Sequence, residues 1–229
     1  RTLSSQNIAL RQQAAVSLTE IGAEKLADIK PETRQKLVLV LRSIGIEAVP
    51  ALIQLFKDEN DEVRSSAATA LGQIGAEAKP ALIQALKDES GTVRSQSAKA
   101  LGAIGAEAKS AVPALIQLLD DENLEVRSLA AKALGEIGPE AKPAVPALIQ
   151  LLKGESIGIR RQAAEALAEI GPATTTEVPA LIQALKDESW VVSSQAAEAL
   201  GAIGPEAKPA IPALIQSLKD KRSTVRIQS

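Results

Sequence analysis

A five-residue motif, Pro-Ala-Leu-Ile-Gln, returns along this chain at nearly constant intervals. One interval of 30 residues and then four of 33 separate its prolines, which are Pro50, Pro80, Pro113, Pro146, Pro179 and Pro212. A set of glycines keeps the same intervals, namely Gly75, Gly105, Gly138, Gly171 and Gly204. Self-similarity at a fixed period of this length predicts an array of stacked structural repeats.

The stretch 111–138 (AVPALIQLLDDENLEVRSLAAKALGEIG) shows what one repeat contains. At about 100° per residue, the apolar positions of 112–119 and of 126–137 each gather on one side of a helix. The DDEN turn between them supplies short polar caps, and Gly138 tolerates the left-handed conformation that ends many helices. Such a hairpin cannot bury its apolar side alone. The sequence therefore predicts an all-α fold, an α-α superhelix of stacked antiparallel helix pairs.

We expect first helices near 48–57, 79–87, 111–119, 144–153, 177–186 and 210–219. Second helices are expected near 62–74, 92–104, 125–137, 158–170 and 191–203. The predicted domain is a single solenoid over 1–229, with an irregular N-terminal segment 1–49, regular repeats 50–75, 76–105, 106–138, 139–171 and 172–204, and a truncated repeat 205–229.

The N-terminal segment departs from this pattern. Residues 1–22 are predicted to form the second helix of a repeat whose first helix is missing. The segment 31–45 resembles a first helix, so either a second helix has been lost or 31–45 and 50–57 pair as an atypical hairpin. The repeat that opens at Lys79 lacks three residues, which predicts a shorter first helix. Because both ends cut a repeat, we expect a fragment of a larger solenoid.

The composition disfavours several classes of function. Lys and Arg total 26 against 28 Asp and Glu, so the chain lacks the basic excess of nucleic-acid or acidic-membrane surfaces. The absence of His, Cys and Tyr rules out a Ser–His–Asp triad, a cysteine nucleophile and a His-ligated metal. No apolar run approaches the roughly 20 residues of a membrane span. We expect a cytoplasmic protein with no enzyme activity, cofactor or metal.

With these residues in view, the chain resembles HEAT repeats from Ile8 to the C-terminus. The resemblance rests on the PALIQ first helix, the Asp before the turn and the VRxxAAxALGxIG second helix. These motifs are similar to those of HEAT arrays in bacterial, especially cyanobacterial, proteins. It implies an armadillo-like α-solenoid that binds partners, usually proteins, on its curved faces.

The resemblance also implies a structural ladder of turn aspartates and second-helix arginines. Its members here are Asp58 with Arg64, Asp88 with Arg94, Asp121 with Arg127, and Asp220 with Arg226. Independently, Arg127 falls on the flank of its helix, where a partly buried guanidinium needs acceptors that turn carboxylates supply. Gly154 stands opposite Arg160, and Ser193 stands opposite Asp187. The ladder is therefore expected to be interrupted in two consecutive repeats.

Two other motifs invite a chemical interpretation that we set aside. The turn DENDE (58–62) has alternate acidic spacing, but Val63 stands where a calcium loop needs glycine, so helix capping is favoured. The LGxIG glycines precede no GK[ST] and follow no strand, so they indicate close packing and helix ends rather than a phosphate loop.

Two surfaces are candidates for partner binding. A possible apolar ridge consists of Leu124, Ile157 and Trp190, which share one register at the turns; the alternative is that each packs over its neighbour's turn. The outward side of the second helices, expected to be concave, carries small residues between polar ones. Its candidate partner-binding residues are Ser65, Thr69, Gln73, Ser95, Lys99, Ser128, Lys132, Glu136, Arg161, Glu165, Glu169, Ser194 and Glu198.

The sequence favours a non-enzymatic scaffold that binds a protein partner on the concave face. One alternative is a phycobilin-lyase-like or chaperone-like module, although the chain lacks aromatic residues to surround a tetrapyrrole. A nucleic-acid binder needs a basic groove with stacking aromatics, which the sequence does not supply. A structural spacer and a designed consensus array also remain open, as do the partner's identity and the oligomeric state.

Overall fold

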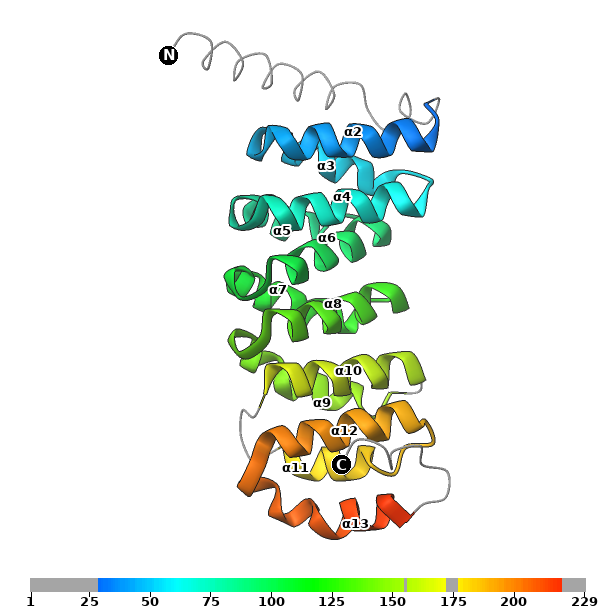
Figure 1. The fold of residues 1–229 in the computed structure, drawn as a ribbon, viewed down its shortest axis with the longest axis vertical. Helices are drawn as coiled ribbons and strands as arrows, with labels where there is room; N and C mark the ends of the chain where they lie inside the picture. Colours follow the sequence, from blue (N-terminus) through cyan, green and yellow to red (C-terminus); the bar gives the residue numbers. More distant parts are fainter. Residues whose placement is uncertain (1–28, 155, 172–176, 220–229) are drawn as a thin grey trace. The chain divides into compact units, whose positions relative to one another are not determined.

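A computed structural model describes residues 29–154, 156–171 and 177–219 of the chain. All regular elements in these ranges are helical, and they form the repeated helix pairs of a helical-repeat solenoid (Figure 1). The contacts divide the chain into two compact units, residues 1–108 (unit 1) and 109–229 (unit 2). Each unit is described by itself below.

Unit 1 contains second helices α2, α4 and α6 and first helices α3 and α5. The second helices are α2 (Pro31–Ile44), α4 (Asp61–Ile74) and α6 (Gly91–Ile104). The first helices are α3 (Val49–Gln54) and α5 (Lys79–Ala85), and short 3-10 turns join the elements at η1 (Ile46–Ala48), η2 (Leu55–Lys57) and η3 (Gly75–Ala78). The second helices run in the same direction, and α4 packs against both α2 and α6 (Figure 1).

Unit 2 repeats this plan. Its second helices are α8 (Leu124–Ile137), α10 (Ile157–Ile170) and α12 (Trp190–Ile203). Its first helices are α7 (Val112–Gln117), α9 (Val145–Leu151), α11 (Val178–Ala184) and α13 (Ile211–Lys219). Within it lie the 3-10 turns η5 (Leu118–Asp120), η6 (Gly138–Ala144) and η8 (Gly204–Ala210), and the segment η4 (Gly105–Ala111) contains the boundary between the two units in the sequence. Helix α10 packs between α8 and α12.

Local chemistry explains where these helices begin and end. Each described PALIQ proline lies in the first turn of its helix, where its missing N–H costs little. The side chain of Asn60 accepts hydrogen bonds from the backbone N–H groups of Glu62 and Val63, and so caps α4. Gly138 ends α8 with φ of 73°, a conformation that a residue with a Cβ rarely adopts. The capping interpretation of the acidic turns is confirmed.

Helix α2 corrects the interpretation of segment 31–45 as a first helix. It spans 14 residues, like α4, it packs against α4, and it ends at Gly45 with φ of 91°. Arg34 holds the fourth position of α2, as Arg64 does in α4. The run of Leu and Val in 37–41 resembles a first helix, but Leu39 and Val40 are exposed, whereas Val38 and Leu41 face the core. Segment 31–44 is therefore a second helix in regular register.

The three-residue deletion near Lys79 also has a different consequence from the one expected. Helix α5 has 7 residues, as α9 and α11 do, and is not shortened. The deletion shortens the preceding 3-10 segment instead: η3 has 4 residues, whereas η6 and η8 have 7 each. Because three residues make one 3-10 turn, the deletion removes a whole turn and preserves the register of the next helix.

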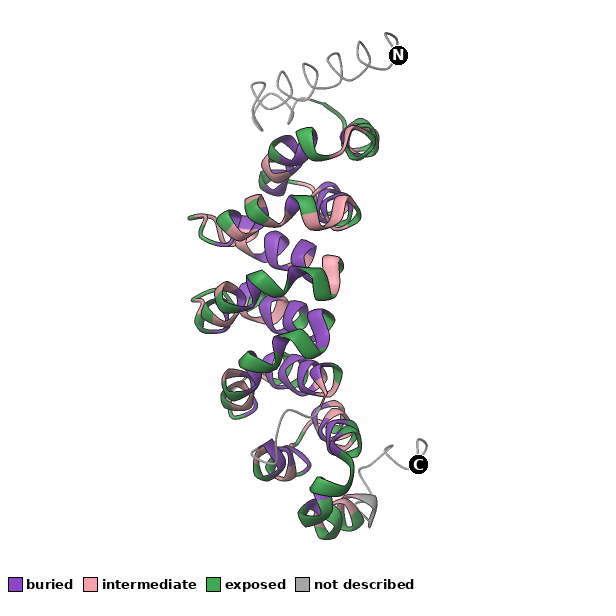
Figure 2. Ribbon diagram, turned by 90° about the vertical axis from the view of Figure 1, so that its left-hand side faces the viewer, coloured by how far each residue is buried: buried purple, intermediate pink, exposed green. Residues whose placement is uncertain are grey.

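The core of each unit lies between its two layers of helices. Figure 2 shows buried residues where the helices of a unit face one another and exposed residues on the turns and outer sides. In α8 the predicted apolar side is buried, with Val126, Ala130 and Leu134 all inaccessible to solvent. Alanine dominates these contacts, which lets neighbouring helices approach closely.

Some expectations fall outside this description. The predicted second helix in 1–22 and the pair formed by Asp220 and Arg226 lie outside the described residues. One solenoid running unbroken over 1–229 stays a prediction, and so does the concave curvature. In the ranges that the structure describes, none of the helices has the length and apolarity needed to cross a bilayer.

Candidate protein-binding surfaces

The second-helix arginines hold the turns that precede them by donating hydrogen bonds to backbone carbonyls of those turns. Nη1 of Arg64 donates to the carbonyl oxygen of Asp58 at 2.5 Å, and Nη1 of Arg127 donates to that of Asp121 at 2.5 Å. Arg94 donates to the carbonyls of Asp88 and Glu89, both at 2.9 Å. The expected pairings are confirmed, but the acceptor is corrected from the side chain to the main chain.

The aspartate carboxylates of these turns make a different set of bonds. One oxygen accepts the backbone N–H two residues ahead, at 2.9 Å in each of the turns that open with Asp58, Asp88, Asp121 and Asp187. This bond is an Asx turn, which shapes the loop before the second helix. In two places the other oxygen binds the arginine of the preceding repeat. Nε of Arg34 lies 3.0 Å from Oδ2 of Asp58, and both side chains are buried.

Arg160 makes the corresponding pair in unit 2. Its Nε donates to Oδ2 of Asp187 at 2.6 Å and its Nη2 donates to Oδ1 at 3.1 Å, with only 9% and 11% of the two side chains exposed. Hydrogen bonding to Asp187 raises the pKa of the Arg160 guanidinium against the opposing effect of burial. Nη1 donates to the carbonyl of Gly154 at 3.0 Å.

The expected interruption at Gly154 is wrong, because its backbone carbonyl accepts a hydrogen bond from Arg160 as that of an aspartate would. At Ser193 the arginine contact to the preceding turn is replaced by a different one, in which Arg160 of the preceding repeat binds the Asp187 carboxylate. An open hollow of about 450 Å³ lies beside Gly154, bordered by Lys153, Lys186 and the paired side chains of Arg160 and Asp187. These arginines are engaged in structural contacts.

The outer face of the second helices, meaning the side turned away from the first helices, carries most of the predicted partner-binding residues. Exposed members are Thr69, Gln73, Lys132, Glu136, Arg161, Glu169 and Glu198. Half-buried members are Ser65, Lys99, Ser128, Glu165 and Ser194. Ser95 is a correction, because it is fully buried and its hydroxyl donates to the carbonyl of Thr92 at 3.0 Å.

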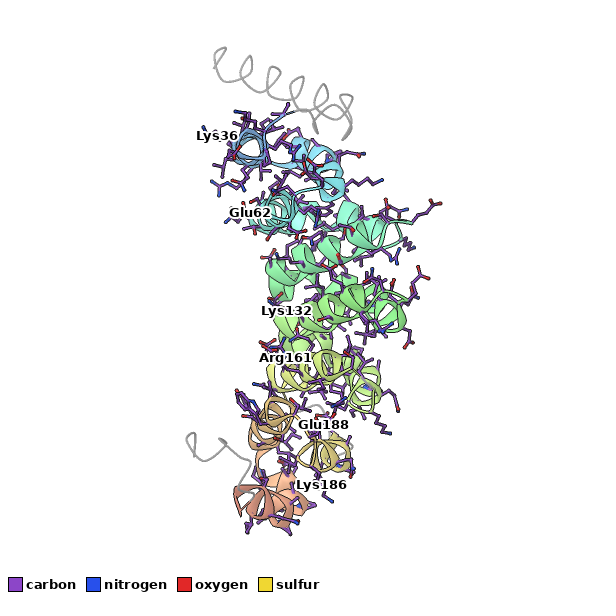
Figure 3. All side chains as sticks on the ribbon, turned by 90° about the vertical axis from the view of Figure 1, so that its right-hand side faces the viewer. Lys36, Glu62, Lys132, Arg161, Lys186 and Glu188 are labelled. Atoms are coloured by element: carbon purple, nitrogen blue, oxygen red, sulfur yellow. The ribbon has the colours of Figure 1, made fainter. Side chains whose placement is uncertain are left out.

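Polar contacts on this face join neighbouring helices in unit 1 and lie within one helix in unit 2. In unit 1, Nζ of Lys99 donates to Oγ of Ser65 at 2.7 Å, joining α6 to α4. In unit 2, Nζ of Lys132 lies 3.7 Å from Oε1 of Glu136 on the same helix. Figure 3 shows Lys132 of α8 and Arg161 of α10 along the same edge of unit 2. The face thus presents polar groups from consecutive helices side by side.

Four glutamates form an acidic cluster on this face in unit 2, namely Glu136, Glu165, Glu169 and Glu198. Burial raises the pKa of the Glu169 carboxyl, and repulsion from Glu165, Glu136 and Glu198 adds to the rise, whereas attraction to Lys132 opposes it. A Cβ added at Gly135 would meet the Glu169 carboxylate and lie 3.0 Å from Cα of Ala166. The glycine therefore lets α10 approach α8 and gives the Glu169 carboxylate room against the helix backbone.

The apolar ridge lies in unit 2 and is open to solvent. Leu124, Ile157 and Trp190 are 53%, 49% and 57% exposed, and each is the first residue of its second helix. The alternative, in which each side chain packs over its neighbour's turn, covers at most about half of each. The ridge is therefore available for contact with another molecule.

Sequence reasoning missed a groove between α2 and α4. It has a volume of about 560 Å³ and a floor that includes Val38 and Ala70. Its two ends are bridged by hydrogen bonds, from Gln35 to Glu62 at 2.8 Å and from Arg42 to Gln73 at 2.7 Å. Arg42 occupies the register that glycine holds in α4, α6, α8 and α12. Because 31–45 was aligned as a first helix, this substitution was not visible.

In the described ranges of the chain, no three His, Cys, Asp or Glu side chains are grouped so that they could hold a metal ion. The aromatic side chains are equally sparse. Phe56 is fully buried in unit 1, so Trp190 is the accessible aromatic residue among those described.

Comparison with known proteins agrees with this geometry. The family model described as HEAT repeats matches residues 23–86, 79–153 and 145–229. No curated protein sequence matches the chain.

Several solved structures are similar. The complex of CpcE and CpcF of phycocyanin lyase from Nostoc sp. PCC7120 matches with a TM-score of 0.60 and 27% identity over 67% of this chain and 98% of that one. An engineered protein matches with a TM-score of 0.54 and 27% identity over 85% and 90%. A designed armadillo repeat protein in complex with the peptide (KR)4 has a TM-score of 0.54 and 23% identity over 84% and 92%, which supports the fold alone.

Proposed function

Since this chain belongs to the HEAT-repeat family, we propose that it is a non-enzymatic scaffold that binds a protein partner through the outer face of its second helices. The observation that carries the proposal is the regular presentation of that face. Consecutive parallel helices expose polar side chains in one register, such as Lys132, Glu165 and Glu198, with buried alanines between them. A repeated, shallow and polar surface suits an extended partner better than a small substrate.

The residue types on this face also support binding over catalysis. The chain has no His, Cys or Tyr, which removes the most common general base, histidine, and the cysteine nucleophile. The arginines that are least exposed donate to turn carbonyls and turn carboxylates. What remains accessible is a set of hydroxyls, carboxylates and amines spread over several helices. The similarity to a complex of two protein chains, CpcE and CpcF, adds support for a protein partner.

An affinity experiment tests this function. The tagged chain is used to recover partners from the source organism, in parallel with a variant carrying Lys132→Glu, Arg161→Glu and Ser194→Lys on the outer face. The matched control carries Lys142→Glu, Lys186→Glu and Gln183→Lys, which are exposed residues on or beside the first helices. We expect the outer-face variant to lose a partner that the control retains. Equal recovery by both variants contradicts the proposal.

One observation favours a second candidate function. The phycocyanin lyase chain is matched over 98% of its length, which supports a bilin-handling module as an alternative. The described residues offer it little, because Trp190 is the accessible aromatic side chain among them. Mixing the protein with a free phycobilin and recording the visible spectrum decides this point. A shifted absorbance band that Trp190→Ala abolishes would favour the alternative.

A further inference from the structure

The apolar ridge leaves hydrophobic surface in water at three consecutive repeats of unit 2. Covering such side chains by a partner is favourable in proportion to the apolar area removed from water. In unit 1, by contrast, the same register holds Pro31, Asp61 and Gly91. The apolar character is therefore no requirement of the repeat, because unit 1 folds the same way without it.

The ridge and the outer face belong to one surface. On a helix with about 3.6 residues per turn, Leu124, Ser128 and Ala131 fall on the same side, and Gly135 continues that line. The corresponding line in α10 starts at Ile157. The ridge thus lies across the N-terminal ends of α8, α10 and α12. The next residues on this side are Ser128 and Ala131 in α8, Arg161 and Ala164 in α10, and Ser194 and Ala197 in α12. A segment lying across the helices therefore meets small side chains behind the ridge in α8 and α12, and the Arg161 side chain in α10.

The charges on this surface are unbalanced. Lys132 and Arg161 are its cations, whereas the acidic cluster contributes four carboxylates from three helices. Lys132 lies beside Glu136 and Gln162 donates to Glu165 at 2.7 Å. Burial raises the pKa of the Glu169 carboxyl, and repulsion from Glu165, Glu136 and Glu198 adds to the rise, whereas attraction to Lys132 opposes it. A cation brought to the cluster relieves this repulsion.

We propose that unit 2 binds a segment of a protein partner in which apolar side chains alternate with Lys or Arg. The apolar side chains cover Leu124, Ile157 and Trp190, and the cations lie beside Glu165, Glu169 and Glu198. Charge complementarity identifies this occupant. Anionic lipid or nucleic acid would meet the carboxylates, and a second copy of this face would bring glutamate against glutamate. The inference rests on the proposed function, and it names the chemistry of the partner.

Trp190 is the only tryptophan of the chain, which has no tyrosine, so its fluorescence reports directly on the ridge. The probes are three tryptophan-free peptides, acetyl-(Leu-Lys-Lys)4-amide, acetyl-(Ser-Lys-Lys)4-amide and acetyl-(Leu-Glu-Glu)4-amide. We expect the first to shift the Trp190 emission to the blue with a saturating curve. The second should bind at least about tenfold more weakly, and the third should give no shift.

Matched variants separate the two contributions. Glu165→Gln, Glu169→Gln and Glu198→Gln together should weaken binding of the leucine–lysine peptide about tenfold, at roughly half a kcal/mol for each exposed charge pair. The control removes three exposed charges elsewhere, by Glu107→Gln, Glu140→Gln and Glu206→Gln, and should change binding less than about twofold. Leu124→Ser with Ile157→Ser keeps the reporter and should also weaken binding, with circular dichroism verifying that both variants fold.

Two results overturn the proposal. Equal affinity for the leucine–lysine and serine–lysine peptides would show that the ridge does not contribute to binding. Equal affinity of the glutamine variant and its control for the leucine–lysine peptide would show that the acidic cluster does not contribute. The outcome is distinguishable from failure of the proposed function. If the peptides do not bind while the outer-face variant still loses its natural partner, the scaffold proposal stands and this description of the partner fails.

Discussion

Units 1 and 2 are built from the same repeat, yet their outer faces differ. In unit 1 the second helices begin with Pro31, Asp61 and Gly91, and Arg42 stands beside a groove. In unit 2 they begin with Leu124, Ile157 and Trp190, and α10 approaches the backbone of α8 at Gly135. The buried positions are nearly interchangeable between the units. The comparison teaches that the repeat prescribes the packing and leaves the surface free to specialise.

The largest expected effect comes from the buried ion pair that each unit contains. Arg160→Ala should lower the free energy of unfolding by about 3 kcal/mol, because it leaves the Asp187 carboxylate buried without its cation. Arg34→Ala in unit 1 should cost a similar amount, since Asp58 is as deeply buried. Urea denaturation of both variants measures the change.

Arg127→Ala serves as the reference for these two variants. Its guanidinium donates to the backbone carbonyls of Asp121 and Glu122, so we expect a loss of about 1 kcal/mol. A loss as large as that of Arg160→Ala would show that the carbonyl contacts, and not the ion pairs, dominate.

Glycine packing gives the next effect. In Gly135→Ala the new Cβ would lie 3.0 Å from Cα of Ala166, and we expect a loss of about 1–2 kcal/mol. In unit 1, Gly72→Ala would place a Cβ 2.7 Å from that of Ala103 and should cost a comparable amount. At Gly201 nothing lies within 4 Å, so Gly201→Ala should stabilise α12 by about 0.5–1 kcal/mol. Thermal unfolding monitored by circular dichroism gives the sign of each change.

A smaller effect is expected at a polar residue that distinguishes the core of unit 1. Ser97 of α6 is fully buried, and its hydroxyl has no hydrogen-bond partner among the described residues. Alanine holds the same register in α4, α8, α10 and α12. Ser97→Ala should therefore raise the free energy of unfolding by about 1 kcal/mol. A decrease measured in urea would indicate that the hydroxyl is satisfied.

The smallest expected effect depends on pH. The raised pKa of Glu169 means that ionisation of this carboxyl costs the folded state more than the unfolded one. Wild type therefore loses stability relative to Glu169→Gln as the pH rises above about 4.3, the ordinary carboxyl value. At pH 7 the variant should be more stable by less than about 1 kcal/mol, because the group is partly exposed. Below about pH 4 the two proteins should unfold together.

Glu140→Gln is the control for this experiment, because it removes one negative charge from an exposed turn outside the acidic cluster. The same pH-dependent gain in both variants would assign the effect to net charge rather than to the surroundings of Glu169.

Much of the fold could be predicted from the sequence because the repeat is strict. The PALIQ prolines, the turn residues and the closing glycines each act locally, so period and helical spacing suffice to place helices such as α8 and α10. The exposed register of Leu124, Ile157 and Trp190 followed from the same spacing. The HEAT resemblance pointed correctly to arginines that hold the turns.

What the sequence did not reveal depends on contacts between repeats. The true register of α2 was signalled by Arg34 and Gly45, each 30 residues before Arg64 and Gly75, but the run of Leu and Val in 37–41 fits either kind of helix. That Arg160 binds the following turn cannot be read from spacing, because a long side chain reaches either neighbour. The burial of Ser95 likewise depends on how closely other segments pack on α6.

The attachment of Arg64, Arg94, Arg127 and Arg160 to backbone carbonyls has a consequence for how such arrays grow. Every residue type has a backbone carbonyl oxygen. A duplicated repeat therefore keeps the hydrogen bond from its arginine to its own turn whatever side chain the turn has acquired, as the turn at Gly154 shows. Duplication or loss of a whole repeat then leaves this contact intact in every other copy, and only the apolar packing and the optional ion pair between new neighbours must form again. Array length in such proteins is thus free to change in single steps while each remaining hairpin keeps its shape.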